Sequence, residues 1–130
     1  GLMAIKLTKR SRARLEGGHP DLVAVVELAI IMTPIDFTVI EGLRTPERQR
    51  ELYRAGATKT LNSRHLTGHA VDLAPLVKGQ VRWDWPLFHQ LAPAMKDAAY
   101  ELGVSLEWGG DWPRFPDGPH FELSRYKYSA

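Results

Sequence analysis

The sequence predicts a single α+β domain over residues 1–130, in which a mainly antiparallel sheet packs against helices. Three segments have helical periodicity, several short segments have the pattern of strands, and no repeat or linker divides them. A chain of 130 residues also has the size of one domain and can bury about two-thirds of its unfolded surface. We interpret Gly1 and Leu2 as an added remnant, with the natural chain beginning at Met3.

The first helix is predicted at 19–32, where HPDLVAVVELAIIM is apolar around most of its circumference. Pro20 suits the first helical position, Asp21 complements the positive end of the helix dipole, and Pro34 stops the helix. We therefore expect a central, buried helix. The alternating segment DFTVIEG predicts a short strand at 36–42 directly after it.

Two more helices are predicted further along the chain. The second, TPERQRELYRAGA at 45–57, has Thr45 as its N-cap and Gly56 near its end. The third lies at 85–103, where an apolar stripe predicts an amphipathic helix packed on a sheet. The remaining strands are predicted at 69–75, 104–108 and 120–123.

The chain contains no cysteine, which excludes several kinds of site. It cannot have a disulfide framework, a cysteine nucleophile or cysteine-ligated zinc. Any metal site must therefore be built from His, Asp and Glu.

The net charge of +2 is unevenly distributed, because KLTKRSRAR contains Lys6, Lys9, Arg10, Arg12 and Arg14. We interpret this cluster as a solvated surface stretch beside a helix. It has no interleaved aromatic residues that could stack on bases, so we expect no nucleic-acid partner.

No secretory or membrane-spanning segment is predicted. GLMAIKL is a short apolar stretch followed by basic residues, which does not fit a signal peptide. The longest apolar run, LVAVVELAII, contains Glu27 and is too short to span a bilayer. We therefore expect a protein that is made in the cytoplasm, has no stable membrane insertion and does not leave by the ordinary secretory route.

The segment SRHLTGHAVDL predicts part of a metal site. Asp72 lies on an otherwise apolar strand, where a carboxylate is costly to bury unless it is paired or binds a metal. Gly68 allows a reversal that brings His65 beside Asp72, and His120 begins the last strand. Three such ligands on neighbouring strands, with a fourth position open to water, would form a catalytic zinc site. Closure by His69 or Glu122 would instead give a structural site, and each histidine taken alone also fits an ordinary core or turn residue.

Hydrolysis of an amide at such a site also needs a general base and a donor for the oxyanion. Asp117 precedes His120 in the short turn DGPH and is the first candidate for the base, although Asp-Gly is also common in ordinary turns. Glu122 is the rival base, or a partner that orients an imidazole. Arg44, at a predicted junction of strand and helix, is the candidate donor, with a surface ion pair as the alternative.

Together, SRHLTGHAVDL and EWGGDWPRFPDGPHFEL resemble the LAS metallopeptidases, which are zinc enzymes of bacterial cell-wall metabolism. The family includes D-alanyl-D-alanine carboxypeptidases and shares its fold with the hedgehog signalling domain. The likeness is greatest to short phage endolysins that cut between L-alanine and D-glutamate. The family motif Ser-x-His-x-x-Gly-x-Ala-x-Asp matches Ser63, His65, Gly68, Ala70 and Asp72.

The resemblance covers essentially the whole chain. A second motif, an acid shortly before a Pro-His pair, matches Asp117 and His120, and a Gly-x-Arg-Thr/Ser element matches Gly42, Arg44 and Thr45. Many members have glutamate as the base, whereas this chain has the shorter Asp117, as some endolysins do.

The resemblance implies a zinc-dependent endolysin that hydrolyses the L-alanyl-D-glutamate bond of peptidoglycan stem peptides. His65, Asp72 and His120 would bind zinc, Asp117 would deprotonate the attacking water, and Arg44 would stabilise the oxyanion. Ser63 would hydrogen-bond the substrate, and Trp108 or Trp112 would line the pocket, with core packing as the alternative for both tryptophans.

Two other functions remain open from the sequence: a D-alanyl-D-alanine carboxypeptidase of the same family, and a catalytically silent, zinc-stabilised module that binds the cell wall. For the endolysin we expect a monomer that acts on peptidoglycan. It would stay in the cytoplasm of the bacterial host until lysis.

Overall fold

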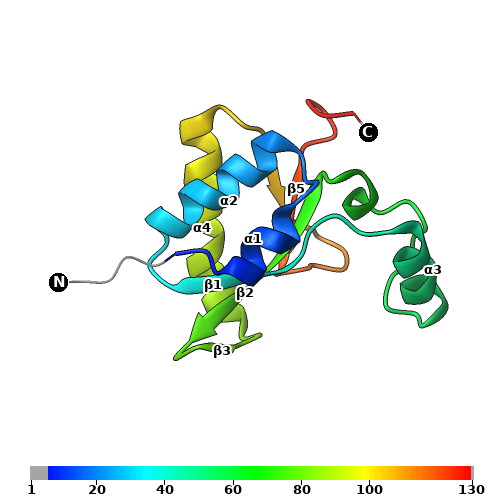
Figure 1. Ribbon diagram of the computed structural model, residues 1–130, viewed down its shortest axis with the longest axis horizontal. Helices are drawn as coiled ribbons and strands as arrows, with labels where there is room; N and C mark the ends of the chain where they lie inside the picture. Colours follow the sequence, from blue (N-terminus) through cyan, green and yellow to red (C-terminus); the bar gives the residue numbers. More distant parts are fainter. Residues whose placement is uncertain (1–5, 130) are drawn as a thin grey trace.

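Helices and short strands are interspersed along the chain, as Figure 1 shows for a computed structural model that describes residues 6–129. Gly1, Leu2 and Met3, and with them the predicted start of the natural chain, lie outside the described residues. The α-helices, 3-10 turns (η) and strands follow in the order α1 Lys9–Leu15, α2 Pro20–Met32, β1 Asp36–Glu41, α3 Pro46–Arg54, η1 Arg64–Thr67, β2 Ala70–Val77, β3 Gln80–Val81, α4 Trp85–Leu102, β4 Leu106–Trp108, η2 Gly109–Asp111 and β5 His120–Leu123.

The strands form one sheet in which every pairing among the described residues is antiparallel, as predicted. Their order across the sheet is β1-β2-β5-β4, and β3 pairs with β2. The central strands β2 and β5 place Asp72 directly opposite His120, although 48 residues separate them in the sequence. The sheet therefore brings together the two sequence segments that carry the predicted site.

The hydrophobic core is formed by α2, α4 and the strands. Helix α2 packs against α4, and α4 contacts β2. As expected for a central helix, α2 buries Leu22, Val25, Val26, Ala29 and Ile30. From the sheet, Phe37, Leu73 and Phe121 fill the core, each at most 1% exposed. The predicted α+β architecture, with helices packed on an antiparallel sheet, is confirmed.

The basic segment near the start of the chain forms a helix, α1, that was not predicted. Its Lys and Arg side chains are exposed, as expected, but Ser11 and Leu15 are buried on the opposite side. The hydroxyl of Ser11 accepts a hydrogen bond from the Val39 amide at 2.9 Å, and Arg14 donates to the Val39 carbonyl at 2.9 Å. Helix α1 is therefore attached to β1 by polar contacts, which leave no periodic apolar pattern in the sequence.

Helix α3 differs from the other helices because it lies apart from the core (Figure 1). Its only buried residue is Gln49. The helix ends at Arg54, before the predicted end at 57, because Gly56 takes a left-handed φ of 75°. Among residues 6–129, no helix combines the length and the apolar character needed to cross a bilayer.

Candidate active site

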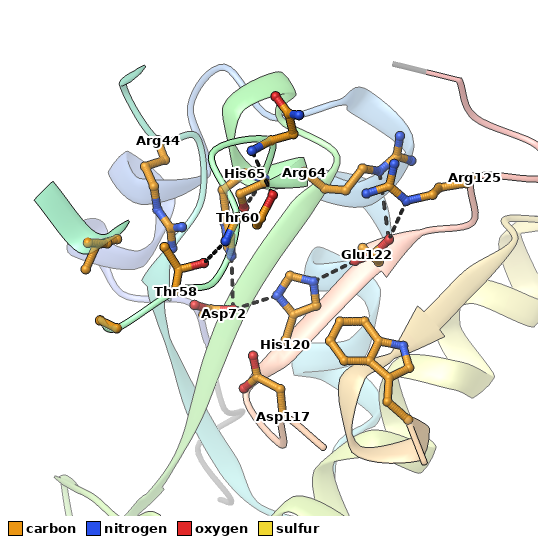
Figure 2. A pocket seen from close by; sticks show the side chains of 15 residues that line it. Arg44, Thr58, Thr60, Arg64, His65, Asp72, Asp117, His120, Glu122 and Arg125 are labelled. Atoms are coloured by element: carbon orange, nitrogen blue, oxygen red, sulfur yellow. Dashed lines mark hydrogen bonds and ion pairs between the residues drawn. The ribbon is translucent and has the colours of Figure 1, made fainter. Parts of the chain in front are cut away.

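A His–Asp–His cluster lies at the centre of a cleft beside β2 and β5 (Figure 2). The Nε2 atom of His65 is 3.1 Å from Asp72 Oδ1, and the Nδ1 atom of His120 is 3.2 Å from the same oxygen. One potential ligand atom from each residue lies within 4.8 Å of the other two. The cluster is therefore a possible site for a metal ion.

The sheet register positions two of the three residues. Asp72 and His120 are directly paired across the antiparallel strands β2 and β5, so their side chains project from the same face of the sheet. Phe121, next to His120, is fully buried in the core on the opposite face. Packing of the core therefore also fixes the direction in which His120 points.

His65 reaches the cluster from the 3-10 turn η1, which corrects the expectation that all three residues lie on neighbouring strands. The Ser63 hydroxyl accepts a hydrogen bond from the His65 amide at 3.2 Å and begins the turn, and Gly68 ends it with a φ of 76°. A turn replaces a strand because Gly68 takes this left-handed conformation, which favours glycine. A β-carbon on residue 68 would also lie only 2.8 Å from the Gly17 carbonyl oxygen. The predicted reversal at Gly68 is present.

The second ring nitrogen of each histidine has a fixed partner. His65 Nδ1 lies 2.9 Å from the Gly42 carbonyl oxygen, and His120 Nε2 lies 2.8 Å from Glu122 Oε1. When these nitrogens carry the proton, the nitrogens that face Asp72 have free lone pairs. Such outer hydrogen bonds are typical of metal-binding histidines. The donor set of two imidazoles and one carboxylate therefore fits a metal ion such as zinc.

Glu122 is thus placed as the partner of His120, which is one of the three roles that the sequence left open. It is buried, and Arg64 Nε and Arg125 Nε each lie 3.9 Å from its second oxygen. Burial raises the pKa of Glu122, but the hydrogen bond from His120 and the positive charges of His120, Arg125 and Arg64 together outweigh this, so the net pKa is lowered. An ionised Glu122 is well suited to orient His120.

Within the cluster, the pKa values of Asp72 and His120 are shifted in opposite directions. Burial favours the protonated form of Asp72, but the hydrogen bonds from His120 and His65 lower its pKa well below the usual range. Burial lowers the pKa of His120, yet hydrogen bonds to Asp72 and Glu122 raise it to about 9. Without a metal, a proton on His120 therefore compensates the two carboxylates.

Asp117 lies in the turn before β5, at the edge of the same cleft (Figure 2). Its amide donates to the Gly109 carbonyl at 2.9 Å, and its carbonyl accepts from the His120 amide at 3.2 Å. A β-carbon at Gly109 would lie 2.5 Å from the Asp117 carbonyl oxygen, so this position requires glycine. Although Asp117 is solvent-accessible, partial desolvation in the cleft raises its pKa, and the charge of Asp72 adds to this shift.

Arg44 lines the cleft on the side away from Asp117 (Figure 2). Its side chain is 9% exposed and forms an ion pair with Glu41, with its Nε 2.6 Å from Glu41 Oε1. Its Nη1 donates to Gln49 Oε1 at 2.7 Å. These contacts hold the guanidinium in place and leave further N–H groups that can donate into the cleft.

The two tryptophans named from the sequence have different environments. Trp108 is 5% exposed, stacks on Phe121 and donates its indole N–H to the Gly118 carbonyl at 2.7 Å. Trp112 lines the cleft, with its ring centroid 5.1 Å from that of His120. The structure therefore does not bring Trp108 into the cleft, because the indole fills the core and supports the turn after Asp117.

The cleft has a volume of about 480 Å³ and extends beyond the cluster toward α3. Ser63 lines it, but the Ser63 hydroxyl is already used to begin η1. Gln49 supports two of the lining residues: it accepts from Arg44 and donates to the Thr60 carbonyl at 2.6 Å. Sequence reasoning missed Gln49, because no pattern distinguishes it from the other polar residues of α3. The remaining lining residues are Leu52, Ala57, Thr58, Thr60, Asn62, Arg64 and Arg125.

Comparison with known proteins identifies the family to which this site belongs. Residues 3–125 match the model of the phage L-alanyl-D-glutamate peptidases. The chain belongs to this family. It is 33% identical to the L-alanyl-D-glutamate peptidase of Escherichia phage T5, an alignment that covers 98% of this chain and 96% of the phage protein. The resemblance found in the sequence is confirmed.

Solved structures agree with the family and the fold. The crystal structure of the Serratia marcescens L-Ala D-Glu endopeptidase ChiX matches with a TM-score of 0.92 and 50% identity, covering 98% of this chain and 96% of that one. A D,D-dipeptidase of vancomycin resistance, VanXYg, matches with a TM-score of 0.56 and 20% identity over 82% of this chain and 50% of that one, which shows a shared fold. Both solved structures thus share the fold of this chain.

Proposed function

We propose that this protein is a zinc-dependent peptidase that hydrolyses the L-alanyl-D-glutamate bond of peptidoglycan stem peptides. The His65–Asp72–His120 cluster, set in an open cleft with a carboxylate and a guanidinium at its edges, is the observation that carries the proposal. The bond is inferred from the names of the relatives, which are L-alanyl-D-glutamate peptidases. Peptidoglycan is the material that contains this bond, so we also propose the cell wall as the site of action.

Zinc is the metal that best fits the donors. Two imidazole nitrogens and one carboxylate oxygen, with at least one position left for water or substrate, are typical ligands of catalytic zinc. Bound there, zinc would supply Lewis-acid chemistry, polarising a carbonyl and acidifying water. The outer partners Gly42 and Glu122 would hold the two imidazoles in the orientation that ligation needs.

Asp117 is the proposed general base. Its carboxylate lies at the edge of the cleft, is not among the three ligands, and has a raised pKa that makes it a stronger proton acceptor than an ordinary aspartate. It would take the proton of the attacking water and later pass it to the leaving amine. Glu122 is less suited to this role because its carboxylate is buried and bonded to His120.

Arg44 is the proposed donor to the oxyanion. Nε, Nη1 and Nη2 each bond to Glu41 or Gln49, and both Nη1 and Nη2 retain a second N–H. A guanidinium held in place before the reaction stabilises a developing negative charge without first having to reorganise. We also propose that Ser63, at the edge of the cleft, contacts the substrate through its hydroxyl.

The proposal is tested by mass spectrometry of the fragments that the protein releases from purified peptidoglycan. New N-terminal D-glutamate is the expected product, and a chelator should abolish its release. Free D-alanine would instead support the carboxypeptidase alternative. Binding to cell walls without any cleavage, in the zinc-loaded protein, would support a silent binding module.

A further inference from the structure

Two exposed tryptophans lie outside the cleft, Trp83 in the connection between β3 and α4 and Trp85 at the first position of α4. Trp83 is 57% exposed and Trp85 is 44% exposed. The residue between them, Asp84, has extended backbone angles, so both rings can turn to the same side. Both rings do contact Phe88, at centroid distances of 6.4 Å and 6.2 Å. Large exposed aromatic side chains that share one side commonly mark a binding surface.

Trp83 and Trp85 pack, through Phe88, next to the turn that carries Asp117. Phe88, which supports both, lies 3.1 Å from the position that a β-carbon on Gly118 would occupy, and Trp85 lies 3.4 Å from it. Trp108 holds the same turn from the core through its bond to the Gly118 carbonyl. The aromatic surface therefore continues directly from the proposed catalytic turn.

The ring of Trp83 is oriented as a platform. It lies nearly parallel to Phe88, with an interplanar angle of 29°, so one ring face is turned toward Phe88. More than half of the residue is exposed, so much of the indole remains open to solvent beside this contact. The polar side chains of Arg82 and Asp84 flank the ring in sequence and are paired with each other at 2.5 Å. An apolar ring face with polar groups at its edge is the surface that a pyranose ring requires.

The proposed substrate places a sugar close to the scissile bond. L-Alanine is the first residue of the stem peptide and is joined to muramic acid through its lactyl group. The scissile carbonyl is therefore only about six covalent bonds from a sugar ring, on the order of 7 Å at ordinary bond lengths. A stem peptide cut after L-alanine cannot reach the cleft without bringing the glycan strand beside it.

We propose that Trp83 and Trp85 form a stacking platform for the sugar rings of the glycan strand, next to the cleft that takes the stem peptide. This inference rests on the proposed L-alanyl-D-glutamate cleavage. The indole rings of the platform are uncharged, which suits the uncharged faces of N-acetylated sugars. The basic residues Arg44, Arg64 and Arg125 line the cleft, which suits an anionic peptide.

The test compares two substrates with the same scissile bond. One is a muramyl tetrapeptide within a glycan chain, and the other is the free tetrapeptide. Trp83→Ala should lower kcat/KM on the glycan-linked substrate by roughly three- to tenfold, the range expected for one aromatic stacking contact, and should leave the free peptide unaffected. Trp85→Ala should act in the same direction, and its metal content and melting temperature will show whether the turn at Gly118 is intact.

Tyr100→Ala is the matched control, because Tyr100 is 84% exposed but lies at the other end of α4. Tyr100→Ala should leave kcat/KM unchanged on both substrates. Peptide-free glycan strands, prepared with an amidase, should quench tryptophan fluorescence in the wild type and do so less in Trp83→Ala.

Equal losses on the two substrates would overturn the platform, as would no loss on either. Concentration-dependent self-association that Trp83→Ala abolishes, with the substrate ratio unchanged, would also overturn it and identify a contact between copies of the chain. If the wild type does not release N-terminal D-glutamate at all, the proposed function itself fails, whatever the tryptophan variants do.

Discussion

Two parts of the cleft are built by different means: its floor, where β2 and β5 carry Asp72 and His120, and its α3 side. The floor strand β5 is buried at all four positions, and its register with β2 places His120 opposite Asp72. On the other side, α3 buries Gln49 alone, and the hydrogen bonds of that side chain link Arg44 to the Thr60 loop. The floor, with its possible metal site, is thus determined by backbone pairing and core packing, whereas the α3 side depends on a few side-chain contacts.

This difference separates the effects of substitutions. Changes to the floor should remove the metal, because its three donors act together. Changes at the cleft edges should lower the rate while the metal stays bound. The predictions below test this separation, beginning with the largest expected effect.

His120→Ala should lose the metal and all measurable peptidase activity, because it removes a donor that two strands hold in place. Metal analysis after dialysis and a peptidoglycan release assay measure both effects. His69→Ala is the control, since His69 Nδ1 bonds to Thr67 and the residue is outside the cluster. Loss of metal in His69→Ala, with metal retained in His120→Ala, would refute the ligand assignment.

Asp117→Asn should keep the metal and the melting temperature but lower cleavage by roughly 10²–10⁴-fold, because asparagine cannot accept the proton. The matched variant Glu122→Gln weakens the partner of His120 and should lower metal affinity by about 10–100-fold. With the metal saturating, Glu122→Gln should recover most of its activity. An active Asp117→Asn beside a metal-loaded but inactive Glu122→Gln would reverse the two roles.

Arg44→Lys should lower turnover by roughly 10²-fold, the lower end of the effect of removing one oxyanion donor. Lysine keeps the charge but not the planar fork that bonds to Glu41 and Gln49 while donating into the cleft. Metal content and melting temperature should remain close to those of the wild type. Unchanged turnover would leave Arg44 as a residue of the ion pair with Glu41 only.

Gln49→Ala should have a smaller effect, a loss of about five- to tenfold in kcat/KM, because it removes neutral hydrogen bonds that position other groups. Glu41 would still hold Arg44. Steady-state kinetics on a soluble stem peptide measures the loss. A complete loss of activity in Gln49→Ala would show that α3 is as essential as the floor.

The metal-free protein should become less stable as the pH rises. The pKa of His120 is raised from 6.5 to about 9 in the folded chain, so this contribution to stability is complete below pH 6.5 and disappears as the pH passes about 9. The Tm of chelator-treated protein should therefore fall by several degrees over this pH range, because each kcal/mol of lost stability lowers Tm by roughly 2–8 °C. The zinc-loaded protein should not show it, because the metal replaces that proton. Equal curves for both forms would contradict the assignment of His120 as a ligand.

Much of the architecture, and the three residues that meet in the His–Asp–His cluster, could be predicted from the sequence. Apolar periodicity located α2 and α4, and the alternation around Asp72 located β2. Asp72 lies on an apolar strand and needs a partner, and two histidines can supply one: His65, across the reversal at Gly68, and His120, at the start of the last strand. Helix α1 escaped prediction because its attachment to β1 uses Ser11 and Arg14 rather than an apolar stripe.

Only the tertiary structure decided how these residues are used. Glu122 is the partner of His120 because their side chains are hydrogen-bonded. Trp112 lines the cleft and Trp108 does not, because the Trp108 indole fills the core. Local sequence determines periodicity and residue chemistry, because these depend on neighbours along the chain. Which groups meet across 48 residues depends on strand register and packing, and these arise only when the whole chain folds.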